Sequence, residues 1–155
     1  MSELTIGQTA PDFEGESTQG SVRLSELRGQ KVVLYFYPRD NTPGCTTEAS
    51  DFRDQAQAFT ETDCVILGVS RDTMTSHQKF HQKLDLPFAL IADPEETICN
   101  LYGVMKEKMM YGRQVRTIER STFLLDREGQ LVQIWRKVKV PGHVAEVIEQ
   151  AKTIA

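Results

Sequence analysis

One run of residues constrains the fold of this chain more than any other. Residues 31–37 (Lys-Val-Val-Leu-Tyr-Phe-Tyr) are apolar, β-branched or aromatic almost throughout, and Pro38 ends the run. A continuous apolar stretch of this length is typical of a strand buried on both faces, as in the centre of a parallel sheet. Residues 64–70 form a second such run, and the segment between the two has a helical pattern. The sequence therefore predicts a β-α-β unit and an α/β fold.

The rest of the chain continues this alternation. The expected helices cover residues 45–59, a segment from Thr73 or Thr75 to Leu84, residues 93–103, and a stretch from about Gly142 to the C-terminus. The further expected strands cover residues 88–91, 120–126 and 131–135, the last two as a hairpin, and residues 12–24 suit a small hairpin. Together these elements predict a mixed central β-sheet flanked by helices, with an N-terminal β-hairpin extension, in a single domain over 1–155.

Length and charge exclude several classes of function. The 155 residues suit one ordinary domain, and the net charge of -4, without a long basic run, argues against nucleic-acid binding. No apolar stretch approaches the roughly 20 residues that span a bilayer, so we expect no membrane partner. The first residues, Met-Ser-Glu-Leu-Thr, lack the basic and apolar regions of a signal peptide. We therefore expect a cytoplasmic protein whose cysteines are reduced at rest.

Cys45 has the strongest chemical indication of the three cysteines. It stands near the expected start of a helix, after Thr42, which can cap the helix, and Pro43, which suits its first position. Helix N-termini and nearby cations lower the pKa of a thiol from about 8.5 to roughly 3.5–7.5, and the thiolate is the nucleophile. Arg39 or the distant Arg120 could supply the cation. The pattern indicates a reactive cysteine at this position.

A simpler interpretation is that Cys45 is a buried, inert core residue, because free cysteine is among the most buried residue types. This interpretation is favoured for Cys64, which starts a buried strand, and for Cys99, on a short helix near Tyr102. The chain has no C-x-x-C pair at Cys45, so a thioredoxin-type dithiol is excluded there.

Metal binding and protease chemistry have weaker support. There is no paired C-x-x-C and no HExxH for zinc, and we expect neither a metal nor an organic cofactor. His77 and His81 are one helical turn apart and could share a metal, but without a third ligand nearby a solvated helix face is the favoured interpretation. His143 is expected to start the last helix. None of these histidines stands in a setting that indicates a Cys–His protease.

The segment Thr42-Pro43-Gly44-Cys45-Thr46-Thr47-Glu48, with Pro38 before it, resembles the peroxiredoxin signature. Within that family it is most similar to the bacterioferritin comigratory protein (PrxQ) group. The resemblance covers nearly the whole chain, including the blocks at residues 7–13, 35–38, 67–70, 102–104 and 120–126. It combines Pro, Thr and Cys at fixed offsets with an arginine about 75 residues later.

The resemblance implies a thioredoxin-like fold and reduction of hydrogen peroxide and organic hydroperoxides by a thiol reductant such as thioredoxin, glutaredoxin or glutathione. By position, Cys45 is the expected peroxidatic nucleophile, which becomes a sulfenic acid. Thr42 is expected to bind the peroxide and the sulfur, Pro38 to shield the pocket from water, and Arg120 to hold thiolate and substrate. Glu48 is expected to orient the arginine. A monomer or a small homo-oligomer fits this size.

The chain departs from the family at the resolving cysteine. Many members have this residue five positions after the peroxidatic cysteine, where this chain has Ser50, and others have it in the next helix, which here has none. The favoured hypothesis is a one-cysteine route in which an external thiol attacks the Cys45 sulfenic acid. Resolution by Cys99 after local unfolding, by Cys64, or across an intersubunit disulfide stays open.

Three other functions compete with the peroxidase. The first is a non-catalytic peroxide sensor, in which oxidation of Cys45 changes a partner interaction. The other two are a thiol transferase, which the lone cysteine disfavours, and a binding module with a structural Cys45. Residues 105–111 are a further candidate feature, because they could line the entrance of a peroxide pocket, although an exposed loop is the simpler interpretation.

Overall fold

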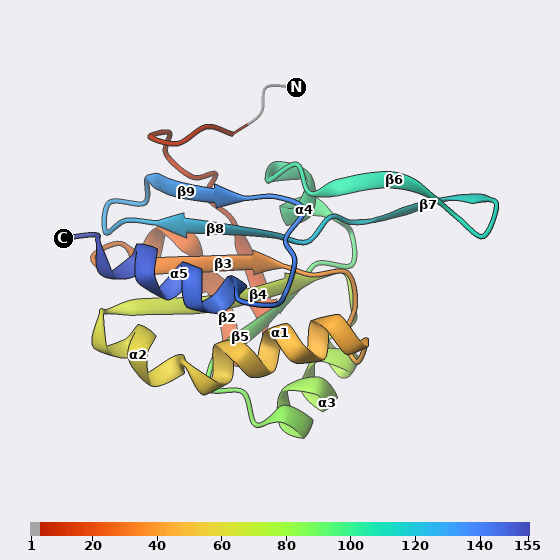
Figure 1. Ribbon diagram of the computed structural model, residues 1–155, viewed down its shortest axis with the longest axis horizontal. Helices are drawn as coiled ribbons and strands as arrows, with labels where there is room; N and C mark the ends of the chain where they lie inside the picture. The colour runs from red at the N-terminus through yellow and green to blue at the C-terminus, as the bar shows by residue number, and fades with distance from the viewer. Residues whose placement is uncertain (1–3) are drawn as a thin grey trace.

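The computed structural model describes residues 4–155, which form one mixed sheet with helices on both sides and a separate hairpin (Figure 1). The strands are β1 (Glu14–Ser17), β2 (Gly20–Arg23), β3 (Lys31–Phe36), β4 (Cys64–Ser70), β5 (Ala89–Ala92), β6 (Met105–Met110), β7 (Arg113–Ile118), β8 (Ser121–Leu125) and β9 (Leu131–Trp135). The helices are α1 (Pro43–Asp54), α2 (Ala56–Glu61), α3 (Met74–Leu84), α4 (Thr97–Leu101), α5 (His143–Lys152) and the short 3-10 helix η1 (Leu24–Leu27). No helix within residues 4–155 is both long and apolar enough to cross a membrane.

The seven-stranded sheet has the order β2-β1-β5-β4-β3-β8-β9. Strands β3, β4 and β5 run parallel, whereas β8 pairs antiparallel with β3, and β1 pairs antiparallel with β5. Every residue of β3 is buried, as its apolar run predicts. The predicted fold class, the N-terminal hairpin of β1 and β2 and the hairpin of β8 and β9 are confirmed.

Two cores lie on opposite faces of the sheet, because successive side chains of a strand point to opposite sides. Val33 and Tyr35 of β3 pack into the core covered by α1, α2, α3 and α5. Leu34 and Phe36 pack into the other core, which η1 and α4 cover. The sheet therefore separates the side chains of the molecule into two compartments.

Three elements differ from the sequence prediction. The helix expected over residues 93–103 is limited to α4, because Glu96 before it has a left-handed φ of 65°. The helix expected over residues 45–59 is divided at Gln55, which ends α1 and precedes α2. The segment at residues 105–111 is not a loop, since β6 pairs along its full length with β7 in a two-stranded hairpin. This hairpin extends beyond the rest of the molecule, and most of its side chains are exposed (Figure 1).

Candidate active site

Cys45 is the third residue of α1. The helix α1 follows β3 in the chain, after the loop at residues 37–42 (Figure 1). The helix begins at Pro43, whose fixed φ suits that position and which has no amide hydrogen to leave unpaired. The first intrahelical bond in this turn joins the amide of Thr46 to the carbonyl of Thr42, at 2.9 Å. The amide of Cys45 therefore belongs to the open first turn of α1, where the helix dipole is positive. The thiol is almost fully buried, at 2% exposure.

Arg120 contacts both Cys45 and Glu48. It lies between β7 and β8, and its Nη2 donates to Cys45 Sγ at 3.3 Å while its Nη1 donates to Glu48 Oε1 at 2.7 Å. Glu48 lies one turn after Cys45 on α1 and is fully buried. The structure therefore brings together Cys45, Glu48 and Arg120, which are up to 75 residues apart in the sequence.

Gly44 makes room for this contact. A Cβ atom at position 44 would lie 3.2 Å from Arg120 Nη2, tighter than nearly all real contacts of a Cβ. A side chain at this position would therefore push the guanidinium group by a few tenths of an ångström from its place beside the sulfur.

Thr42 and Pro38 lie in the loop that connects β3 to α1. Thr42 occupies the N-cap position, but its side chain does not cap the helix, contrary to the sequence prediction. Its Oγ1 instead donates to the carbonyl of Arg39 at 2.9 Å, which folds the loop back on itself. Pro38 is half-buried and lines a cavity of about 360 Å³ with Arg39 and Arg71.

Burial dominates the electrostatics of Glu48. Desolvation raises its pKa from 4.5 to about 7, although the charge and hydrogen bond of Arg120 act in the opposite direction. The pKa of Arg120 is raised despite its own burial, because Glu48 and Cys45 favour the charged guanidinium. Among residues 4–155, Glu48 Oε2 has no hydrogen-bond partner, so half of this carboxylate is unsatisfied there. A buried acceptor of this kind is costly when ionised.

Tyr35 is a neighbour of the site that sequence reasoning missed. Its ring stacks on Phe52 of α1 at a centroid distance of 4.6 Å, and its hydroxyl is buried without a partner. Desolvation, followed by the charges of Glu48 and Cys45, raises its pKa well above the ordinary value. The sequence does not indicate that Tyr35 lies near Cys45 and Glu48, because it is one of several aromatic residues in an apolar run.

This constellation can be compared with known proteins. Residues 6–134 match the family model described as the AhpC/TSA family. The peroxiredoxin Bcp of Bacillus subtilis is 50% identical over 153 residues, which cover 98% of each chain. The chain belongs to the AhpC/TSA family and is a peroxiredoxin. Peroxiredoxins are thiol-dependent peroxidases, and the chain is an enzyme of this kind.

Solved structures of similar peroxiredoxins share the whole fold. A bacterioferritin comigratory protein of Xanthomonas campestris, described in connection with alkyl peroxide reduction, is 44% identical with a TM-score of 0.89, over 96% of this chain and 98% of that one. A PrxQ mutant of Xylella fastidiosa is 39% identical with a TM-score of 0.92 and covers 98% of both chains. The predicted membership of the PrxQ group and the predicted thioredoxin-like fold are confirmed.

The other two cysteines of this peroxiredoxin lie away from Cys45. Cys99 is fully buried on α4, in the core on the opposite face of the sheet, where its backbone amide donates to Asp93 at 2.8 Å. Cys64 shares a core with Cys45, but it pairs with Lys31 at the beginning of β3, whereas Cys45 follows the end of that strand. The six residues of β3 between them span roughly 20 Å.

The prediction that His77 and His81 form a solvated face of their helix is wrong. His77 is fully buried, and its ring nitrogens lie 2.7 Å from Asp40 Oδ2 and 2.9 Å from the carbonyl oxygen of Ile91. His81 is half-buried. The sequence could not show the partner of His77, because Asp40 is 37 residues away. His143 begins α5, as predicted.

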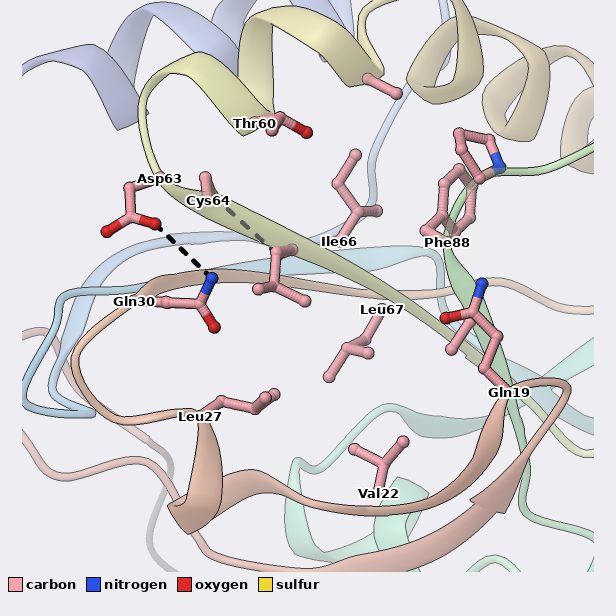
Figure 2. Close-up of a pocket in the computed structure, with 14 residues that line it drawn as sticks. Gln19, Val22, Leu27, Gln30, Thr60, Asp63, Cys64, Ile66, Leu67 and Phe88 are labelled. Atoms are coloured by element: carbon pink, nitrogen blue, oxygen red, sulfur yellow. Dashed lines mark hydrogen bonds between the residues drawn. The ribbon is translucent and has the colours of Figure 1, made fainter.

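A cavity of about 350 Å³ opens at the other end of the sheet (Figure 2). Cys64 and Phe88 line it together with Val22 and Leu27, and a hydrogen bond joins Gln30 and Asp63 at 3.5 Å. Cys45 does not line this cavity. Burial raises the pKa of the Cys64 thiol to about 12, so this sulfur is a poor nucleophile.

Proposed function

We propose that Cys45 is the peroxidatic cysteine of this enzyme. Its thiolate attacks one oxygen of the hydroperoxide, an S–O bond forms, the O–O bond breaks, and the second oxygen leaves with the electron pair and takes up a proton. The products are a Cys45 sulfenic acid and water or an alcohol. The observation that carries the proposal is the guanidinium of Arg120, which holds the sulfur at 3.3 Å and is itself held by Glu48.

Arg120 suits this role because its charge favours the thiolate. Its planar group has five N–H donors, and those not bound to Cys45 and Glu48 can contact a substrate oxygen. Charge moves onto the leaving oxygen during the reaction, so a fixed donor beside it lowers the barrier. Glu48 is the positioning residue that fixes the direction of the guanidinium group.

Thr42 and Pro38 have supporting roles in this proposal. The hydroxyl proton of Thr42 is used in the bond to Arg39 O, which leaves the lone pairs of Thr42 Oγ1 to accept the O–H of a hydroperoxide. Pro38 adds no amide hydrogen to the loop and shields the approach to Cys45 from water. Hydrogen peroxide and organic hydroperoxides are the proposed substrates.

An external thiol is the proposed reductant of the sulfenic acid. Cys99 lies across the sheet from Cys45 and Cys64 lies at the far end of β3, so neither thiol can meet Cys45 unless the core opens. Position 50, on α1, is a serine. Thioredoxin, glutaredoxin and glutathione are the candidate reductants. The sulfur of the reductant would displace the oxygen of the sulfenic acid as water and form a mixed disulfide, and a second thiol of the reductant would then cleave this disulfide and release the Cys45 thiol.

Two cysteines of a relative stand at a spacing that this chain does not repeat after Cys45. Two solved structures of Xanthomonas campestris peroxiredoxin Q are single cysteine-to-serine mutants at positions 36 residues apart in that protein. The position 36 residues after Cys45 in this chain is His81, on α3. A second cysteine at that spacing is therefore absent from this sequence.

The decisive experiment combines turnover with mass spectrometry. Cys45→Ser is expected to abolish reduction of hydrogen peroxide and cumene hydroperoxide with each thiol reductant, whereas the matched control Cys64→Ser keeps most of the activity. Unchanged peroxide consumption by Cys45→Ser would overturn the proposal.

The same enzyme, treated with peroxide in the absence of a reductant, tests the external-thiol route. We expect the mass of a Cys45 sulfenic acid or of its higher oxides, and no internal disulfide. A Cys45–Cys99 bond in the monomer would defeat the one-cysteine route without affecting the role of Cys45. Reaction of Cys45 with peroxide but no turnover with any reductant would instead favour a peroxide sensor.

A further inference from the structure

A buried polar cluster includes Asp40, which lies in the loop between β3 and α1 that precedes Cys45. At its centre is Asp40, whose side chain is 1% exposed. Asp40 Oδ1 accepts from the hydroxyl of Tyr37 at 2.7 Å, and Oδ2 accepts from the hydroxyl of Ser76 at 2.8 Å and lies 2.7 Å from His77 Nδ1. The backbone amide of Asp40 donates to Asp72 Oδ2 at 2.9 Å. One residue therefore connects the end of β3, the loop after β4 and the first turn of α3.

The two neighbours of His77 determine where its protons are. Nε2 faces the carbonyl oxygen of Ile91, which can only accept, so Nε2 carries a hydrogen. Nδ1 faces the carboxylate of Asp40. A neutral ring with its hydrogen on Nε2 would place a lone pair against that carboxylate, so a second proton lies between Nδ1 and Oδ2. The two side chains are therefore joined by a hydrogen bond between Nδ1 and Oδ2.

The position of Asp40 gives this pair its importance. Asp40 is five residues before Cys45, in a loop where Asn41 has the left-handed φ of 64°. No sheet pairing holds Asp40, because β3 ends at Phe36 and α1 begins at Pro43. The contacts of the Asp40 carboxylate and amide therefore fix the path of the chain from the sheet to the first turn of α1.

The same atoms are not available to a cation. Asp40, Asp72 and His77 place ligand atoms within 4.8 Å of one another, as a metal site would require. However, Asp40 Oδ2 already binds Ser76 and His77, and Asp72 Oδ2 already accepts from the amide of Asp40 and from Ser70. The polar groups of the cluster are hydrogen-bonded to one another, so the cluster stabilises the conformation of the loop between β3 and α1.

We propose that the buried His77–Asp40 pair is the positioning device of the active-site loop, and that it sets how fast Cys45 reacts with peroxide by holding the first turn of α1 in the geometry that places the sulfur beside Arg120. His77 acts through the loop and does not touch the substrate. The inference rests on the proposed role of Cys45, because the rate that it concerns is the rate of that thiol.

Two substitutions of His77 separate positioning from simple packing. In His77→Asn, the amide nitrogen can take the place of Nδ1 and donate to Asp40, whereas in His77→Gln it can take the place of Nε2 and donate to Ile91 O. We expect the second-order rate of sulfenic acid formation with hydrogen peroxide to fall about tenfold or more in His77→Gln, since small displacements of a reacting group are costly. The rate of His77→Asn is expected to stay within about threefold of the wild-type rate.

The control for stability is Phe59→Leu, which loosens the same core from α2 without contacting the loop. Its rate is expected to match the wild-type rate even where its melting temperature falls as far as that of His77→Gln. Equal rates in His77→Gln and wild type would overturn the proposal, and so would an equal loss of rate in Phe59→Leu. If His77→Gln does not fold, Ser76→Ala removes a single donor to Asp40 and is expected to lower the rate severalfold; an unchanged rate there also overturns the proposal.

Nuclear magnetic resonance of the histidine rings provides a second readout, which packing alone would not change. Wild-type protein is expected to show one slowly exchanging proton on His77 Nε2 and a second between His77 Nδ1 and Asp40 Oδ2, and the absence of the second would contradict the proton assignment. The rate of wild-type Cys45 with peroxide, measured in parallel, separates the two proposals. If wild-type Cys45 does not react with peroxide, the proposed function is refuted. If it does react and His77→Gln reacts at the same rate, only this inference is refuted.

Discussion

Arg120 contacts both the sulfur of Cys45 and the carboxylate of Glu48, and each of these groups is costly to bury as an anion without a partner. A thiolate and a carboxylate both lose solvation in a buried site, and the guanidinium of Arg120 offers a donor to each, at 3.3 Å from Cys45 Sγ and 2.7 Å from Glu48 Oε1. The two contacts use separate nitrogens of one rigid plane. The position of the sulfur relative to the carboxylate is therefore set by the shape of the guanidinium as well as by its charge.

Replacing Arg120 with lysine tests the importance of this shape. Arg120→Lys keeps the positive charge but has only one nitrogen, which cannot reach both partners in the same way. We expect the rate of Cys45 with hydrogen peroxide to fall by about a hundredfold, as when one preorganised donor is removed from an active site. Stopped-flow measurement of sulfenic acid formation provides the value. The control Arg127→Lys, which changes a surface pair with Asp63, should keep the wild-type rate.

The pH dependence of stability depends on Glu48. Its pKa is raised by burial from 4.5 to about 7, so between these values the folded chain binds a proton that the unfolded chain does not. The corresponding stabilisation is complete below pH 4.5 and is lost as the pH rises through about 7.

When the pH rises from about 5 to about 8, the free energy of unfolding of the wild-type protein is expected to fall by on the order of 2 kcal/mol more than that of Glu48→Gln. Urea unfolding at the two pH values measures this difference. The exposed substitution Glu149→Gln, on α5, is the matched control and should keep the wild-type dependence. If the free energy of unfolding changes with pH equally in Glu48→Gln and in the wild type, the raised pKa of Glu48 is contradicted.

Helix α3 owes its start to Thr73, and the same helix carries His77. Thr73 has extended backbone angles, and its Oγ1 accepts from the amide of Ser76 at 3.2 Å, so it caps the helix as the sequence predicts. Thr73→Ala should lower the free energy of unfolding by about 1 kcal/mol. Thr75→Ala, inside the first turn and exposed, should leave it nearly unchanged. Chemical denaturation of the two variants makes the comparison, and equal stabilities would show that the cap is not stabilising.

The sequence predicts the elements whose pattern is local. The runs that become β3 and β4 are apolar on both faces, which is why the residues alone indicate that these strands are buried. The hairpin of β6 and β7 has no such signal, because Lys106, Glu107 and Lys108 are exposed in succession and no alternation marks a strand. Its pairing with β7 comes from backbone hydrogen bonds, which the side-chain pattern does not record.

The candidate site also contains residues that the sequence predicts and residues whose environment only the fold reveals. The sequence places Cys45 at a helix start, and the family resemblance brings in Arg120 and Glu48, which the structure puts in contact with each other. The burial of His77 and the orphaned hydroxyl of Tyr35 could not be predicted, because each depends on neighbours from other elements. A polar side chain on a helix is most often solvated, and only the distant Asp40 makes His77 an exception.

At the scale of the whole molecule, the sheet controls the access of reagents to the three thiols. Cys99 is fully buried in one core, and Cys64 is 6% exposed in the other. Burial raises the pKa of both thiols, that of Cys64 to about 12. Both features oppose reaction with an alkylating reagent, which requires exposure and a thiolate.

We therefore expect iodoacetamide to modify Cys99 only through opening of the core, and to modify Cys64, which lines the cavity of Figure 2, slowly because its pKa is about 12. In the Cys45→Ser variant, the rate of modification should be very low in buffer and rise with urea in parallel with unfolding. Mass spectrometry after timed alkylation follows each cysteine separately. Rapid labelling of Cys99 in buffer would show that α4 opens locally. It would then favour Cys99 as a resolving cysteine.

The placement of the other two thiols, Cys99 across the sheet and Cys64 at the far end of β3, also bears on how the proposed enzyme would behave in a cell. On the proposed external-thiol route, the attack on the Cys45 sulfenic acid is a bimolecular step, whereas attack by a tethered cysteine would be unimolecular. The fraction of molecules in the oxidised form at steady state then depends on two concentrations, that of hydroperoxide and that of the external thiol. A fall in either supply would shift the population, so the enzyme would register the ratio of the two supplies while it removes peroxide.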